Sequence, residues 1–73
     1  GQDLDKALEM STKAIAAEPD NPTYLDTHAR VLYKKGNYKE AEKHMKRALQ
    51  LLKEPDATYQ EHYNAILQKL GKN

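Results

Sequence analysis

The feature that most constrains this chain is an internal repeat with a period of about 34 residues. The pattern of residues 24–36 recurs at residues 59–71, where five positions carry the same or a similar residue. The matching positions are Tyr24 and Tyr59, Asp26 and Glu61, Leu32 and Leu67, Lys34 and Lys69, and Gly36 and Gly71. A repeat of this length is one supersecondary unit that cannot bury its apolar face alone, so neighbouring units must stack. The 73 residues leave room for one small domain built in this way.

Apolar residues recur at helical spacing in four segments. Prolines or a glycine separate the segments: Pro19 and Pro22 after the first, Gly36 after the second and Pro55 after the third. No segment alternates with period two, so no strand is predicted. Short linkers make successive helices antiparallel neighbours. We therefore expect an all-α fold of four antiparallel helices, arranged as αα-hairpins in a short solenoid or helical bundle.

Helix ends are marked by residues with known capping preferences. Asp3 is placed to cap the first segment, and Asn21 can cap the second with Pro22 as its first helical residue. The fourth segment begins at Asp56. The third opens with Asn37-Tyr38-Lys39-Glu40, which predicts a capping box between Asn37 and Glu40. Gly36 and Gly71 are placed to end the second and fourth helices in the left-handed conformation.

Composition excludes several classes of protein. The chain has no cysteine, which removes disulfides and thiolate chemistry. It has no apolar run of the about 20 residues that a membrane span needs, and residues 1–5 do not resemble a signal peptide. Net charge is +1, with residues 30–53 basic and the segments on either side acidic. We expect a soluble protein without membrane attachment, compatible with a reducing compartment such as the cytoplasm, although the sequence does not fix the location.

Residues 32–41, Leu-Tyr-Lys-Lys-Gly-Asn-Tyr-Lys-Glu-Ala, are followed by Ala48-Leu49-x-Leu51. This stretch is similar to the core motif of the tetratricopeptide repeat (TPR) family, and the resemblance extends over essentially the whole chain. Residues 19–27 and 61–63 also resemble the last repeats of bacterial TPR proteins. His28, Arg30 and Asn64 depart from that pattern, because apolar residues or a glycine are usual there.

The TPR frame divides the single domain 1–73 into three parts. Residues 1–21 correspond to the second helix of a partial repeat, residues 22–55 to a complete repeat, and residues 56–73 to the first helix of another partial repeat. We expect an excised or engineered module, and the sequence does not distinguish between these two origins.

The resemblance implies a concave groove that binds an extended or helical peptide. The residues that it places along this groove are Thr23, Asp26, Arg30, Tyr33, Lys34, Thr58, Glu61, Ala65, Gln68 and Lys69. The candidate binding residues are Asp26, Arg30, Tyr33, Lys34, Glu61, Gln68 and Lys69. We do not expect the carboxylate clamp of chaperone-binding TPRs, since Asp26 stands at a clamp position and would repel a carboxylate.

Three histidines raise the alternative of a metal site. His28 and His62 are 34 residues apart, so they would lie at similar heights on neighbouring helices, near Asp26 and Glu61. No single helix carries a His-x-x-x-His or His-x-x-Glu pair, and zinc needs three or four converging ligands. We predict no metal and no cofactor, with His28 packed at a helix interface and His44 paired with Glu40. The sequence leaves open whether His28 and His62 are packing residues or ligands.

A basic stripe raises nucleic-acid binding as an alternative function, and one serine raises catalysis. Lys39, Lys43, Lys46 and Arg47 recur at helical spacing, but no aromatic platform or nucleic-acid motif accompanies them. Ser11 has no base at a fixed spacing, and no glycine-rich loop is present. We therefore expect neither nucleic-acid binding nor catalysis.

Two functions follow from these observations. The first is a protein–protein interaction module that binds a peptide or partner segment, of unknown identity, through the groove. The second is a structural or self-assembly scaffold, including an engineered protein with no natural ligand, in which exposed end faces pair with copies of the chain.

Overall fold

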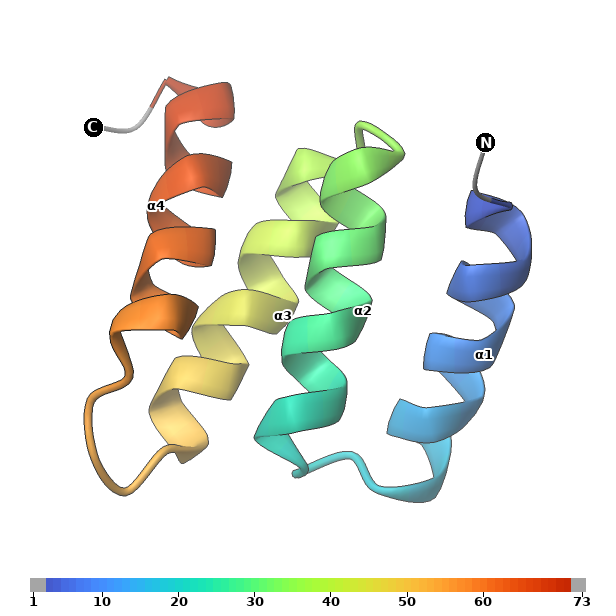
Figure 1. The fold of residues 1–73 in the computed structure, drawn as a ribbon, viewed down its shortest axis with the longest axis horizontal. Helices are drawn as coiled ribbons and strands as arrows, with labels where there is room; N and C mark the ends of the chain where they lie inside the picture. Colours follow the sequence, from blue (N-terminus) through green and yellow to red (C-terminus); the bar gives the residue numbers. More distant parts are fainter. Residues whose placement is uncertain (1–2, 72–73) are drawn as a thin grey trace.

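A computed structural model describes residues 3–71 and shows four helices in sequence (Figure 1). They are α1 (Leu4–Ala17), α2 (Pro22–Lys34), α3 (Tyr38–Leu51) and α4 (Ala57–Leu70). The helices lie side by side in chain order, with α2 and α3 in the centre. No strand occurs in the described part of the chain, and the predicted all-α fold of four helices is confirmed.

Two of the three predicted N-caps form, at Asp3 and Asn21, and Asp56 forms a further cap at the start of α4. The Asp3 carboxylate accepts a hydrogen bond from the Lys6 backbone N–H at 3.0 Å. The Asn21 side chain accepts from Thr23 N–H at 2.9 Å, and Asp56 accepts from Thr58 N–H at 2.9 Å. Each cap satisfies backbone donors that the first turn of a helix leaves without a partner.

The predicted capping box at α3 is wrong, because Asn37 makes no side-chain cap hydrogen bond. A capping box needs the Asn37 backbone N–H as the donor to Glu40. That N–H instead donates to Leu32 O at 2.9 Å, where the chain leaves α2. The Glu40 carboxylate lies 3.7 Å from His44 Nε2, one turn further along α3. The tight connection between α2 and α3 therefore uses the donor that the box would have required.

Both predicted glycine ends have the left-handed backbone. Gly36 follows the C-cap of α2 with φ 87°, and Gly71 caps α4 with φ 74°. Only glycine adopts this region without a steric cost, so Gly36 allows the chain to reverse within three residues between α2 and α3.

Small residues allow α2 and α3 to approach closely. Ala29 on α2 and both Ala41 and Ala48 on α3 are completely buried, and these two helices form the most extensive pair. The helix α1 packs on α2, and α4 packs on α3 with a smaller contact to α2. The largest fully buried side chains are Met45 and Ile66. The arrangement brings residues of α2 and α4 together on one side of the molecule.

Candidate peptide-binding groove

The predicted groove residues of α2 are divided between the interior and the surface. Arg30 and Lys34 are exposed, Tyr33 is half-buried, and Asp26 is buried with 6% of its surface accessible. Steps of three and four residues place Arg30, Tyr33 and Lys34 on one side of the helix. Arg30, Tyr33 and Lys34 are therefore available to a ligand, whereas Asp26 acts within the fold.

Asp26 joins α2 to α4. One carboxylate oxygen is 2.8 Å from His62 Nδ1 on α4, and the other is 3.5 Å from Arg30 Nε. A buried carboxylate needs such partners, since an unpaired one is costly to desolvate. The contact fixes the two helices relative to each other and holds the Arg30 guanidinium at the groove surface. Asp26 is thus a positioning residue for the groove.

A pocket of about 180 Å³ lies between α2 and α4. Its lining combines three predicted residues, Arg30, Tyr33 and Lys34, with His62, Ala65 and Ile66 from α4. The Tyr33 ring is held against Tyr38 in an edge-to-face contact, with the ring centroids 5.5 Å apart. An apolar floor and two cationic side chains on its edge suit an apolar side chain that is accompanied by a carboxylate.

The predicted residues of α4 lie outside this pocket. Glu61, Gln68 and Lys69 are exposed on α4 and do not line it. Of the other positions implied by the resemblance, Ala65 lines the pocket, and Thr23 lies 3.4 Å from the Tyr59 hydroxyl, which donates to it. The structure therefore brings the α2 residues together and leaves Glu61, Gln68 and Lys69 on the surface beside them.

His62 lines the pocket between α2 and α4, and the sequence did not assign it to the candidate groove. The repeat spacing did place it near Asp26, which is where it lies. His28 has a different environment, because its Nδ1 shares a 2.7 Å hydrogen bond with Ser11 Oγ and its ring packs edge-on against His44 at 4.6 Å. Among residues 3–71, no group of three His, Cys, Asp or Glu side chains is arranged to hold a metal ion.

Burial lowers the pKa of both His28 and His44 below the usual histidine value. His28 is buried in the fold, whereas the His44 side chain keeps 20% of its surface exposed. The His44 pKa is partly restored by Glu40. These two histidines belong to the helix interface and not to the groove.

A tetratricopeptide repeat family model matches residues 2–70. The chain belongs to the tetratricopeptide repeat family. No curated protein and no solved structure matches the chain significantly. TPRs are non-catalytic repeats that generally mediate protein–protein interaction. No helix in the described part of this TPR chain has the length and apolar character to cross a membrane.

Proposed function

We propose that this TPR chain is a protein–protein interaction module that binds a peptide or partner segment through the groove between α2 and α4. The observation that carries the proposal is the pocket formed by Arg30, Tyr33 and Lys34 against α4. Its two cations are exposed, so they are accessible to a carboxylate of a partner. Exposed Glu61, Gln68 and Lys69 extend the proposed contact surface along α4.

We also propose that the repeat frame organises this surface. Residues 22–55 form the complete repeat, with residues 1–21 and 56–73 as its flanking partial repeats. In this frame α2 and α4 are equivalent helices of successive repeats, which accounts for their joint contribution to one groove.

The module acts by binding and not by catalysis in this proposal. Ser11, the side chain considered as a nucleophile, is 5% exposed and also donates its hydroxyl to Leu8 O at 3.1 Å. A nucleophile needs access to its substrate, which this position does not provide.

The groove is tested by selecting binders from a displayed library of random ten-residue peptides and measuring their affinities by isothermal titration calorimetry. The variant R30Q/K34E removes both cations on the groove edge. We expect it to weaken the selected peptides at least tenfold, about 1.4 kcal/mol. The control K43E/R47Q makes the same charge change, with the same four-residue spacing, on α3, and should alter the affinity less than twofold for those peptides whose binding R30Q/K34E weakens. Equal affinity for R30Q/K34E and the unaltered chain would refute the groove.

Self-assembly is the second candidate, because an apolar side chain is exposed on an outer helix. Met10 on α1 is 64% exposed, and Leu67 on α4, the other outer helix, is half-exposed. Stacking of such faces is how repeat proteins bury their ends. Sedimentation equilibrium over a wide concentration range tests this function. A concentration-dependent dimer that disappears in M10E/L67E supports it, and a monomer throughout excludes it.

A further inference from the structure

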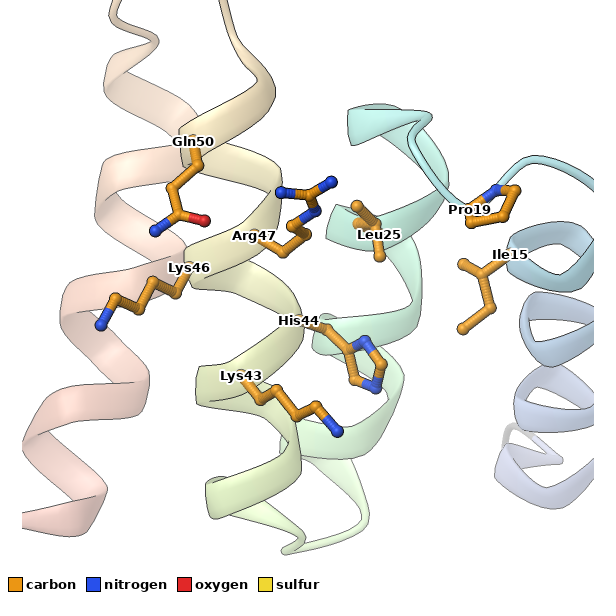
Figure 2. Close-up of a pocket in the computed structure, with 8 residues that line it drawn as sticks. All are labelled: Ile15, Pro19, Leu25, Lys43, His44, Lys46, Arg47 and Gln50. Atoms are coloured by element: carbon orange, nitrogen blue, oxygen red, sulfur yellow. The ribbon is translucent and has the colours of Figure 1, made fainter.

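A second concave surface lies between α1 and α3, away from the groove. It is a cleft of about 420 Å³, within the range of about 300–1,000 Å³ that is usual for ligand sites. In the described part of the chain α1 packs on α2, and no Cα atom of α1 lies within 8 Å of a Cα atom of α3. The cleft is the space between α1 and α3, and α2 forms its floor (Figure 2).

The floor of the cleft is apolar. Ile15 from α1, Pro19 from the following loop and Leu25 from α2 face it. Leu25 is 4% exposed and belongs to the core, so the floor is held rigidly. Such a floor can accept a large apolar side chain and gain free energy by removing its surface from water.

The α3 edge of the cleft is cationic. Figure 2 shows the side chains of Lys43 and Arg47 directed toward the cleft, while Lys46 extends from the other side of the helix. Lys43 and Arg47 are one turn apart, with a rise of about 6 Å between them. Both residues belong to the basic stripe of Lys39, Lys43, Lys46 and Arg47 on α3. No residue of this stripe lines the pocket between α2 and α4.

One carboxylate already binds this edge. Asp20, from the loop between α1 and α2, accepts a hydrogen bond from the Arg47 guanidinium at 2.9 Å. The pair is exposed, with half of the Arg47 side chain accessible to solvent, so Arg47 retains donors for a second carboxylate. The contact with Asp20 shows which chemistry this edge accepts.

We propose that the cleft between α1 and α3 is a second docking site, and that its ligand is a short acidic segment of a partner protein with one large apolar side chain between carboxylates. The apolar side chain contacts Ile15, Pro19 and Leu25, and the carboxylates contact Lys43 and Arg47. This site does not depend on the proposed groove. Leu25 and Lys34 are nine residues apart on α2, about two and a half turns, so the two surfaces use opposite sides of that helix.

The apolar floor favours such a peptide over a nucleic acid. A phosphate backbone would bind the basic stripe through charge alone and would gain nothing from Ile15, Pro19 and Leu25. An acidic segment without an apolar side chain would leave the floor exposed to water. Charge and apolar surface together therefore define the ligand.

The probe is a pool of twelve-residue peptides, acetylated and amidated, with a central Leu or Phe flanked by Asp and Glu. Two matched pools replace either the acids by Asn and Gln or the central residue by Ser, and the oligonucleotide dT12 tests nucleic acid. Binding is measured by calorimetry, and contact with the floor is measured by NMR of the Ile15 and Leu25 methyl groups. The variant K43E/R47Q removes the cationic edge, and R30Q/K34E is its charge-matched control on the opposite side.

We expect the acidic pool with Leu or Phe to bind and to shift both methyl signals. K43E/R47Q should weaken the binding that shifts the Ile15 and Leu25 methyl signals at least tenfold, while R30Q/K34E should change the affinity reported by these two signals less than twofold. Each matched pool should bind at least tenfold more weakly. The proposal is overturned if the acidic pool shifts neither methyl signal at millimolar peptide, if K43E/R47Q binds it unchanged, or if dT12 competes as effectively as the peptide. Loss in R30Q/K34E alone would assign the peptide to the groove and also overturn the second site.

Discussion

At the scale of single residues, the contact between His28 and His44 makes the stability of the fold depend on pH. The two rings touch at 4.6 Å between centroids, and burial lowers the pKa of each. Lys43 lowers the His44 pKa further, and Glu40 opposes both effects. Because the unfolded chain binds protons at a higher pH than the folded chain, the free energy of unfolding falls as pH decreases.

We therefore predict that the free energy of unfolding changes little from pH 7.5 to about pH 6.5 and decreases from there to pH 5.5. The stabilisation is complete above the unfolded histidine pKa of about 6.5 and is lost as the pH falls below it toward the lowered folded pKa values. Urea denaturation followed by circular dichroism measures the change. H28Q/H44Q should show a clearly smaller pH dependence in this range, because the remaining carboxylates protonate mainly below it. An unchanged dependence in that variant would contradict the assignment.

Asp26 is the second residue whose role is decided by its contacts. Replacing it by alanine removes the carboxylate that joins His62 to Arg30, and we expect a loss of about 1–3 kcal/mol from the free energy of unfolding. The effect should be concentrated at α4, where hydrogen exchange of backbone amides should accelerate more than in α1. Glu61→Ala, at an exposed position of the same surface, is the control and should cost less than about 0.5 kcal/mol. Uniform acceleration in all helices would show that Asp26 does not act locally.

At the scale of helices, the side-chain caps at the N-termini differ in strength between α3 and α4. Asp56 bonds to two backbone N–H groups of α4, and we expect D56A to destabilise the protein by about 1 kcal/mol. Asn37 makes no such bond, so N37A should cost less than half as much. Urea denaturation of both variants measures the difference. An equal cost would show that the Asn37 side chain caps α3 in solution.

The difference between these caps has a physical cause. Asp3, Asn21 and Asp56 were predictable because a cap and its partners lie within three residues of each other. The Asn37 N–H, by contrast, donates to Leu32 O of α2. This hydrogen bond depends on how the connection between α2 and α3 folds, which residues 37–40 alone do not determine. The cleft between α1 and α3 was equally beyond the sequence, because it depends on how α2 separates them. The repeat spacing predicted that Asp26 and His62 lie near each other, but it did not predict the hydrogen bond between them.

At the scale of the whole molecule, the core is small, and Met45 and Ile66 are its largest fully buried side chains. A chain of this length is stabilised by about 4–11 kcal/mol in total. Met45 is completely buried at the centre of the core cluster, and replacement of a buried methionine by alanine costs about 2–5 kcal/mol. The cavity left by this change would lie within the core cluster, which also contains Ala29, Ala41 and Ala48.

We therefore predict that M45A loses a large share of the total stability and unfolds at least 10 °C lower, given about 4–8 °C per kcal/mol for domains of this size. Thermal denaturation by circular dichroism measures this shift. M10A removes the same atoms from a side chain that is 64% exposed and should change the midpoint by only a few degrees. If the two variants were equally stable, the α2–α3 interface would not be the part that holds the fold together. A large effect confined to M45A would show that the α2–α3 interface holds the fold together, and α2 from this interface contributes residues to both the proposed groove and the proposed cleft site.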